Sequence, residues 1–296
     1  MILFYGEGRL GNQIFQYQAL SHVAKPGERV LAVGLEDLER SLDLGGARLT
    51  VLTRNGVLKR IVKYAMRPLL LRPLSRTLRL FNYAFEERSG IPPRAGASGE
   101  LSVRRGLLRG LTFVDGGYYQ NSSFWSCLFP AASVRIKQPL REVARTYLTS
   151  VCGAKQRACF VHVRRCDYLT HTDYGLRDLS LPADYYHAAT RELERRLGNT
   201  HFVFVTDDPA WVEETFRGIA DKSIASFDAP MDFAIMTQCA CGILSNSTFS
   251  LAAALMMTDP EVVIAPEYWL GFRIREWLPP KIRYRHSKLS YLPVGA

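Results

Sequence analysis

The sequence predicts an α/β protein made of two halves, each a parallel sheet covered by helices, with a ligand cleft between the halves. Three observations carry this prediction. Apolar runs of strand length alternate with helical patterns along most of the chain. A glycine-rich turn follows the first apolar run. The chain has 296 residues, of which 47% are hydrophobic, and this is enough for two domains of about 150 residues with a core each.

The first half is expected to begin with a strand, a glycine turn and a helix. Residues 1–5 form the apolar run, and residues 12–24 carry apolar side chains at helical spacing. Residues 29–33 predict a second strand. Prolines interrupt the stretch 54–109, for which we expect helices, and a further helix is expected over 140–154.

The second half repeats the alternation more regularly. Its expected strands cover residues 158–163, 201–205, 242–245 and 261–266. Its expected helices cover residues 181–198, 231–240 and 246–257, and another begins near residue 209. Pro182 and Gly198 stand at the two ends of the first of these helices, as helix-boundary rules favour. The expected domains are therefore 1–152 and 153–296.

Positive charge is concentrated in one stretch of the first domain. The net charge is +10, and residues 54–109 contain thirteen Lys and Arg against three Glu. An apolar stripe at helical spacing within it consists of Val57, Leu58, Ile61, Val62 and Ala65. The basic residues expected to face away from that stripe are Lys59, Arg60, Lys63 and Arg67. Two interpretations stay open: a helix packed on its own domain with a solvated basic face, or a helix lying on an anionic membrane surface. No nucleic-acid-binding motif accompanies the charge, so a nucleic-acid partner is not expected.

The composition predicts a cytoplasmic location, with peripheral contact to the inner membrane if the basic helix lies on it. No apolar run reaches the roughly 18 to 20 residues that span a bilayer, and the opening residues lack a signal-peptide pattern. The cysteines contain no C-x-x-C pair, so we expect reduced, mostly buried thiols and no structural metal. They are Cys127, Cys152, Cys159, Cys166, Cys239 and Cys241.

The opening glycine turn indicates a phosphate-bearing ligand. Gly6, Gly8 and Gly11 have the spacing G-x-G-x-x-G, which lets a backbone approach phosphates at a helix N-terminus. A nicotinamide or flavin oxidoreductase is disfavoured, because the acidic residue expected after the second strand is not cleanly placed: Glu36 and Asp37 come late.

Polar residues gather where four of the expected strands end. These ends read "GEGRLGNQ", "HVRRCD", "TDD" and "SNSTFS". Because ligands bind at the carboxyl ends of parallel strands, the four ends predict a polyanionic ligand in the cleft. Arginine forks match phosphate oxygens, so one of the adjacent arginines is expected to face the ligand and the other to enter a structural pair, for which Asp167 is the candidate partner. Ser247 and Thr248 offer hydroxyls and N–H groups at a helix start.

Five motifs together resemble the bacterial and animal α-1,2-fucosyltransferases, which share core motifs with α-1,6- and protein O-fucosyltransferases. They are "GRLGNQIFQY", "HVRRCDY", "FVFVTDDPAWV", "MDFAIMTQC" and "SNSTFSLAAALM". The resemblance implies a GT-B fold of two Rossmann-like domains with a cleft between them, an acceptor-side domain over 1–152 that includes the basic segment, and a donor-binding domain over 153–296. It also implies inverting transfer of L-fucose from GDP-fucose to a galactoside hydroxyl of a surface glycan or oligosaccharide, with no metal or other cofactor. The chain contains no D-x-D pair, which fits the absence of a metal clamp.

The resemblance also implies roles for single residues. Arg165 would hold the β-phosphate and stabilise the leaving group, and Asp232 would accept hydrogen bonds from the guanine amino edge. The other donor-binding residues would be Gly11, Asn12, Gln13, His162, Arg164, Asn246, Ser247, Thr248 and Phe249. The chain departs from the family pattern at Cys166, Thr206 and residues 251–253, which bears more on the acceptor than on the donor.

The catalytic base is not fixed by the motifs. Inverting transfer needs a group that takes the acceptor proton, and the candidates are Asp167, Asp173, His171 and Glu7, with Asp167 in the arginine motif itself. Two related alternatives stay open. The donor sugar could be another GDP-linked deoxy sugar, or the chain could be a non-catalytic module that binds a nucleotide sugar or glycan.

Overall fold

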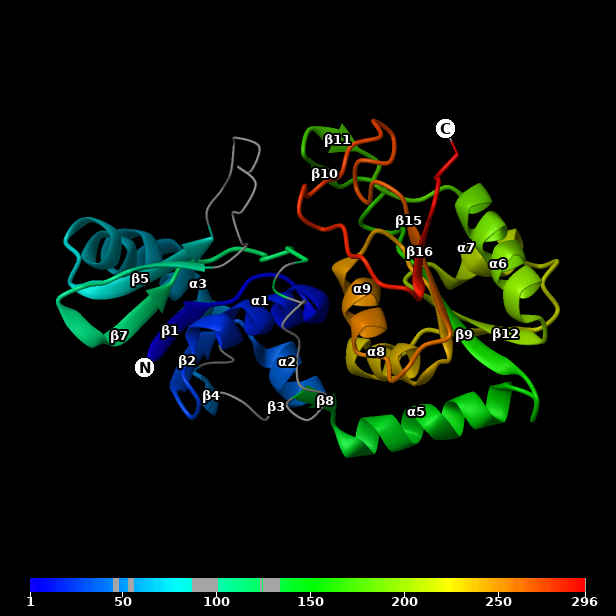
Figure 1. Ribbon diagram of the computed structural model, residues 1–296, viewed down its shortest axis with the longest axis horizontal. Coiled ribbons are helices and arrows are strands. Elements are labelled where there is room, and N and C mark those ends of the chain that lie inside the picture. Colours follow the sequence, from blue (N-terminus) through cyan, green and yellow to red (C-terminus); the bar gives the residue numbers. More distant parts are fainter. Residues whose placement is uncertain (45–47, 53–55, 87–100, 123, 125–133, 296) are drawn as a thin grey trace. The chain divides into compact units, whose positions relative to one another are not determined.

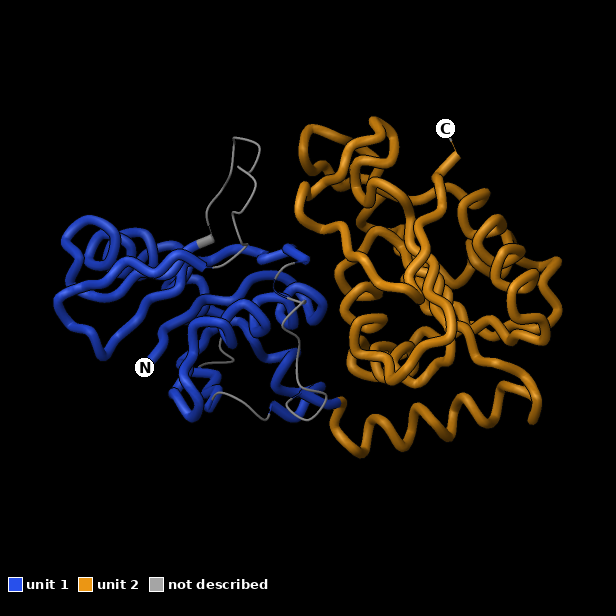
Figure 2. The backbone as a smooth tube through the Cα atoms, in the orientation of Figure 1, with its two compact units in different colours: residues 1–135 blue, residues 136–296 orange. Residues whose placement is uncertain are grey.

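The computed structural model forms two compact units, Met1–Arg135 and Ile136–Ala296 (Figure 2). It describes residues 1–44, 48–52, 56–86, 101–122, 124 and 134–295. Each unit contains a six-stranded sheet. The boundary lies before helix α5 (Gln138–Val151), whereas the sequence analysis placed it after that helix.

Helix α5 belongs to the second unit because its side chains contact helix α8 (Ala229–Gln238) and the turn before it. The Arg145 Nε donates to the Gln238 Oε1 at 2.9 Å. The Tyr147 and Phe227 rings meet edge to face with their centroids 5.3 Å apart. The periodic pattern of this helix predicts its existence, but not which sheet it covers.

The sheet of the first unit is parallel except for one edge strand. Its strands are β1 (Ile2–Tyr5), β2 (Arg29–Val33), β4 (Arg48–Val51), β5 (Phe81–Glu86), β6 (Leu101–Arg104) and β7 (Leu108–Val114). They lie in the order β4-β2-β1-β7-β5-β6, and only β6 runs antiparallel to its neighbour. The strands expected over 1–5 and 29–33 are confirmed. The central strand β1 places the glycine turn at the middle of the carboxyl edge.

Helices and short strands complete the first unit. The helical segments are α1 (Leu10–Val23), α2 (Glu36–Ser41), α3 (Gly56–Ile61) and two π-helical stretches, η1 (Val62–Leu71) and η2 (Pro73–Thr77). The short strands β3 (Leu42–Leu44) and β8 (Val134–Ile136) pair with each other. Helices in the basic stretch are therefore confirmed as far as residue 77, after which the described chain is mostly strand.

The orientation expected for the basic helix is wrong. The side chain of Ile61 is 48% exposed, and no residue of α3 is buried. Instead Lys59 and Arg67 turn inward, whereas Arg60 is exposed. The Lys59 Nζ lies 2.7 Å from the Glu36 Oε2, and Arg67 is buried. Ion pairs with the unit's own carboxylates hold this face inward, so the interpretation in which the apolar stripe packs on its own domain is contradicted.

The sheet of the second unit is wholly parallel. Its strands are β9 (Arg157–Val163), β12 (Thr200–Thr206), β13 (Lys222–Ala225), β14 (Cys241–Ile243), β15 (Val262–Pro266) and β16 (Leu289–Leu292). They lie in the order β13-β12-β9-β14-β15-β16. In chain order this is 3-2-1-4-5-6, the arrangement typical of dinucleotide-binding folds, with its switch point between β9 and β14. The expected strands are confirmed, and two strands that the sequence analysis did not predict, β13 and β16, form the edges of the sheet.

The helices of the second unit cover both faces of its sheet (Figure 1). They are α5, α6 (Ala183–Leu197), α7 (Pro209–Thr215), α8 and α9 (Thr248–Leu255). A two-stranded hairpin, β10 (Thr172–Asp173) with β11 (Leu176–Arg177), stands apart from the main sheet. The core is aromatic, with Phe202, Phe204 and Phe216 fully buried beside Tyr186. This packing fixes the strand ends that carry the motifs.

Candidate functional site

The carboxyl end of β9 places a buried histidine at the switch point of the second unit. The His162 side chain is 4% exposed, and its Nδ1 lies 2.7 Å from the Ser245 Oγ. Its ring centroid lies 5.6 Å from that of Phe249. Burial lowers the pKa of His162 to about 3, and the charge of Arg164 adds to the effect. The imidazole is therefore neutral at physiological pH.

Arg164 lies beside the histidine, two residues further along the chain. Its Nη2 donates to the Asp167 Oδ2 at 2.6 Å, and its Nη1 lies 3.2 Å from the Asp207 Oδ2. Its guanidinium carbon lies 5.8 Å from the ring centroid of Tyr168, whose hydroxyl donates to the Asn246 carbonyl at 3.4 Å. Arg164 is thus connected through Tyr168 to the "SNSTFS" turn, and its charge acts on the imidazole of His162.

Arg165 lies on the opposite side, against helix α7. Its Nε donates to the Asp208 Oδ2 at 3.2 Å, and its guanidinium carbon lies 4.3 Å from the Trp211 ring centroid. Its backbone N–H donates to the Asp207 Oδ1 at 2.9 Å. Asp208 also caps α7 by accepting from the Trp211 N–H. Both arginines thus have carboxylate partners, and the expected pair with Asp167 is made by Arg164.

The start of α9 supplies hydroxyl and amide groups next to His162. Ser247 is the N-cap, and its Oγ accepts from the Phe249 N–H at 3.3 Å. The Asn246 Nδ2 donates to the Leu179 carbonyl at 2.8 Å, whereas its buried Oδ1 has no hydrogen-bond donor in the described part of the chain. Thr248 is the first residue of the helix. This terminus combines helix-dipole potential with hydroxyl donors, which suits an anion.

Asp232 lies in the first turn of α8 and is buried. One carboxylate oxygen accepts from the Phe227 N–H at 3.1 Å. Burial raises the pKa of Asp232 to about 6, and the neighbouring charge of Asp228 adds to it. Phe233, the next residue, has its ring centroid 5.4 Å from that of Phe249, so the Asp232 turn and the α9 turn are packed together.

The expected site residues of the first unit hold the glycine turn in place. The Gln13 Nε2 donates to the Gly8 carbonyl at 3.1 Å and lies 3.2 Å from the Asp37 Oδ2, while its Oε1 accepts from the Leu38 N–H at 2.9 Å. The Asn12 Oδ1 accepts from the Gln120 Nε2 at 3.1 Å. Gln13 is thus bound to two backbone groups of its own unit, and Gly11 is buried at the start of α1.

A cavity of about 410 Å³ opens beside this turn, within the first unit. Charged and polar residues form most of its lining: Glu7, Gln13, Glu36, Asp37, Arg40, Lys59 and Lys63. Gly8, which also lines it, has φ +83°, a conformation that favours glycine. Of the four candidate bases that the sequence analysis names, only Glu7 lines this cavity.

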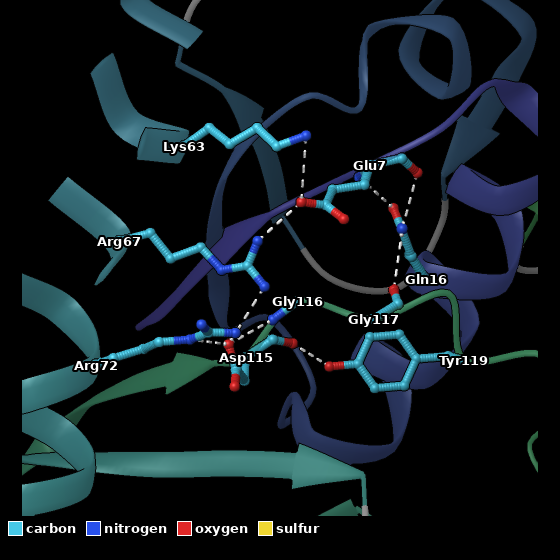
Figure 3. Close-up of polar contacts among 9 residues, drawn as sticks. All are labelled: Glu7, Gln16, Lys63, Arg67, Arg72, Asp115, Gly116, Gly117 and Tyr119. Carbon is cyan, nitrogen blue, oxygen red and sulfur yellow. Dashed lines mark hydrogen bonds and ion pairs between the residues drawn. The ribbon is translucent and has the colours of Figure 1, made fainter. Parts of the chain in front are cut away.

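Gln16 and Arg67 contact Glu7, and Asp115 contacts Arg67 (Figure 3); the sequence analysis assigned none of these three residues to the site. The buried Gln16 donates from its Nε2 to the carbonyls of Glu7 at 2.9 Å and Gly117 at 3.0 Å. The buried Arg67 donates to the Glu7 Oε1 at 2.9 Å and to the Asp115 Oδ1 at 3.4 Å. The signal for Asp115 was available, because "FVDGG" is another strand end followed by glycines.

Metal-ligating and thiol groups are sparse in the described residues. Among them no group of three or more His, Cys, Asp or Glu side chains is arranged to hold a metal ion. Cys159, Cys239 and Cys241 are buried free thiols, and Cys166 is exposed. Cys127 lies outside the described residues.

Comparison with known proteins gives one family and two kinds of relative. The model of "Glycosyl transferase family 11" matches residues 110–273, more than half of the chain. The O-antigen biosynthesis glycosyltransferase WbnK of Escherichia coli is 31% identical over 117 residues, so the match spans 38% of each protein.

The solved structures with similar folds include POFUT1. Its complex with GDP-fucose has a TM-score of 0.52 and 14% identity, covering 86% of this chain and 94% of that one. Its complex with GDP has a TM-score of 0.51 with the same identity and coverage. The expected α/β fold of GT-B type with Rossmann-like units is confirmed by this likeness and by the two parallel sheets.

Proposed function

Because the chain belongs to glycosyl transferase family 11, we propose that it transfers L-fucose from GDP-fucose to a glycan hydroxyl. The proposed acceptor is a galactoside of a surface glycan, the linkage α-1,2, the outcome inversion, and no metal takes part. Support comes from the O-antigen assignment of the Escherichia coli relative and from the GDP-fucose bound by the structural neighbour. The observation that carries the proposal is the cluster of His162, Ser245 and Arg164 at the switch point of the donor sheet.

The contacts favour Arg164 over Arg165 for the diphosphate. The charge of Arg164 acts on His162, and Arg164 contacts Tyr168, which binds the Asn246 carbonyl before α9. Arg165 instead stacks on Trp211. The Asp167 side chain is 49% exposed, and exposed ion pairs contribute little. A phosphate oxygen can therefore take its place on Arg164. The earlier assignment of the leaving-group role to Arg165 stays a prediction that the paired variants below test.

The remaining donor residues follow from the same geometry. Thr248 and Ser247 would bind phosphate oxygens at the helix terminus, and Asn246 has a buried oxygen available for a donor group. The ionised Asp232 would accept from the guanine N–H groups. Phe249, packed between His162 and Phe233, would form the apolar floor.

We assign the base to Glu7. The other three candidates lie in the donor-side unit, where Asp167 pairs with Arg164 and the Asp173 carboxylate accepts from the Tyr174 N–H in a hairpin turn. His171 stacks near Tyr168 with ring centroids 6.3 Å apart. Glu7 lines the cavity in the acceptor-side unit, and Gln16 fixes its backbone there. Glu7→Gln should keep GDP affinity and lose most of the transfer rate, whereas Asp167→Asn removes only the carboxylate that the phosphate displaces from Arg164 and should leave the transfer rate near its original value.

The decisive experiment is a transfer assay with GDP-, UDP- and dTDP-sugars, each with and without EDTA. We expect turnover with GDP-fucose that EDTA does not reduce. Preference for another GDP-deoxy sugar would change the proposed donor sugar but leave the proposed nucleotide-binding site unchanged. Binding of GDP without any transfer would favour a non-catalytic module. Loss of turnover in EDTA, or use of UDP-sugars, would contradict the proposal.

We also propose that residues 56–79, which we call the basic helical segment, rest on an anionic membrane surface. Its exposed large apolar side chains are Val57, Leu58, Ile61, Tyr64, Met66, Leu69, Leu70 and Leu78. The cations Arg60, Arg76 and Arg79 are exposed on the same segment. A segment with apolar and cationic groups facing outward suits the boundary between acyl chains and anionic headgroups. Within the described residues, no helix has the length and apolar character needed to span a bilayer.

A further inference from the structure

A second cavity of the first unit, of about 450 Å³, has no role in the donor site proposed above. We call it the arginine pocket. Its main lining residues are Arg72, Arg76, Arg104, Tyr83, Phe85 and Asp115. The volume lies within the range of about 300–1,000 Å³ that small-molecule sites occupy. Three guanidinium groups and two aromatic rings are an unusual lining for a cavity that serves packing alone.

The arginine pocket lies at the carboxyl edge of the sheet that carries the glycine turn. Asp115 directly follows β7, and Glu7 follows its parallel neighbour β1. Figure 3 shows Glu7 and Asp115 on either side of the Arg67 guanidinium, which donates to both carboxylates. One guanidinium group thus lies between a carboxylate that lines the cavity of Glu7 and a carboxylate that lines the arginine pocket.

The pocket has a surplus of positive charge. Asp115 accepts from the Tyr83 hydroxyl at 2.6 Å, the Arg72 Nε at 2.9 Å and the Gly116 N–H at 2.9 Å. Burial alone would raise the pKa of Asp115, but these hydrogen bonds lower it, so the carboxylate is ionised. Its one negative charge is shared by Arg72 and Arg67. Arg76 and Arg104 have no acidic partner within the described ranges.

The lining of the pocket is held in place by the protein itself. The Arg104 guanidinium carbon lies 4.9 Å from the ring centroid of Phe85, which stacks on the buried Tyr83 at 5.3 Å. Gly116 leaves room for Arg67, because a Cβ there would overlap the Arg67 guanidinium. Pre-formed guanidinium forks bind the paired oxygens of an oxyanion, and aromatic rings pack on the apolar face of a sugar ring.

We propose that the arginine pocket binds an oxyanion carried on the acceptor saccharide, so that the natural acceptor is an acidic glycan. The oxyanion is the carboxylate of an acidic sugar or a phosphate ester, and the reacting hydroxyl of the same molecule lies toward Glu7. This inference rests on the proposed function, because it takes the first unit as the acceptor side.

The experiment titrates three probes into the full-length protein with GDP present to occupy the donor site. The probes are methyl β-galactoside, methyl galacturonoside and galactose 1-phosphate. At least one acidic probe should bind about tenfold more tightly than the neutral one. The double variant Arg76→Ala/Arg104→Ala should bind all three alike. Arg105→Ala, an exposed neighbour that does not line the pocket, is the matched control and should retain the preference.

The outcomes distinguish an acidic sugar from a phosphate ester, and they distinguish failure of this inference from failure of the proposed function. A preference for galactose 1-phosphate alone identifies a phosphate ester, and a preference for the galacturonoside alone identifies an acidic sugar. Equal binding of all three probes by the unmodified protein, or a preference that survives the double variant, overturns the inference. Because the titration involves no transfer, it can succeed where GDP-fucose is not a substrate, and transfer to a neutral galactoside can succeed where the titration fails.

Discussion

The His162 Nδ1 lies 2.7 Å from the Ser245 Oγ, at the carboxyl ends of two adjacent parallel strands. This contact ties β9 to the turn that leads into α9. It holds together the two strand ends between which the chain order of the sheet reverses. The imidazole is buried and neutral, so protonating it in acid should destabilise the folded protein.

Acid should weaken the fold through His162. Its pKa of about 3 in the folded protein compares with 6.5 for an ordinary histidine. The unfolded chain therefore binds the extra proton between these values, and stability that is complete above pH 6.5 is lost as the pH falls toward 3. The loss reaches about 1.4 kcal/mol per pH unit. Urea unfolding at pH 4.5 to 7.5 should show a shallower pH dependence for His162→Gln, and parallel curves would contradict this.

Asp232 should make guanine nucleotide binding depend on pH. Its pKa of about 6 means that the carboxylate takes up a proton just below neutrality. Guanine N–H groups need the ionised acceptor, so GDP affinity should fall by up to about tenfold per pH unit below pH 6. Calorimetric titration of GDP should show this fall. The Asp232→Asn variant should bind GDP more weakly, and its GDP affinity should fall less steeply below pH 6 than the affinity of the unmodified protein does.

The same aspartate should affect stability with the opposite sign to His162. Because its pKa is raised from 3.8, the folded protein binds the proton more tightly, and acidification from pH 6 toward 4 stabilises the fold through this group. Asp232→Asn should therefore steepen the acid loss of unfolding free energy that His162→Gln makes shallower.

Substitution of Arg164 should mainly lower the transfer rate, whereas substitution of Arg165 should mainly lower the stability of the fold. Arg164→Ala should lower kcat by about 100-fold or more, as expected when a group that stabilises developing charge is removed. Arg164→Lys should recover little, since an ammonium lacks the fork. Arg165→Ala should instead cost about 1 kcal/mol of stability through the lost contacts with Trp211 and Asp208. Steady-state kinetics and thermal unfolding of both variants would show it, and the reversed result would return the leaving-group role to Arg165.

Adjacent glycines provide a matched test of the Arg67 bridge. A Cβ at Gly116 would overlap the Arg67 guanidinium, whereas one at Gly117 would meet the Tyr119 ring at an ordinary 3.6 Å. Gly116→Ala should therefore displace Arg67 from Glu7, lower the melting temperature and slow transfer. Gly117→Ala should leave both near their original values. Equal effects of the two variants would mean that Arg67 does not support the site.

The outward apolar face should govern membrane binding. Leu69 is 73% exposed, and full burial of a leucine side chain contributes about 1.5–3 kcal/mol. Leu69→Ser/Leu70→Ser should therefore reduce co-sedimentation with phosphatidylglycerol vesicles by at least about tenfold. Leu107→Ser, another exposed leucine outside the segment, is the control. Charge reversal at Lys59 or Lys63 is unsuitable, because these residues pair with Glu36 and Glu7.

The sequence predicts best what depends on neighbours along the chain. The strands of the second unit are short apolar runs between clear turns, and the clustering of His162 with Ser247 follows from parallel strands ending at one edge. Periodicity predicts that residues 57–65 have an apolar side. It does not predict that Glu36 and Glu7 draw the lysines inward, so the apolar side faces out.

Contacts between residues far apart in the sequence could not be predicted from it. Arg67 meets Glu7 and Asp115 from positions 60 and 48 residues away, and no local pattern encodes such a pair. Likewise, alternation predicts that Arg164 and Arg165 point to opposite sides. Which of them faces the site depends on Trp211, which α7 places beneath Arg165.

The parallel pairing of β16 with β15 bears on how the second unit is made in the cell. Residues 289–292 follow the other five strands of this sheet along the chain, so the six-stranded sheet is completed only after those strands have been synthesised. A chain cut before them would leave Val262–Pro266 as a bare sheet edge, open to self-association. Nascent second units should therefore depend on chaperone shielding longer than nascent first units do.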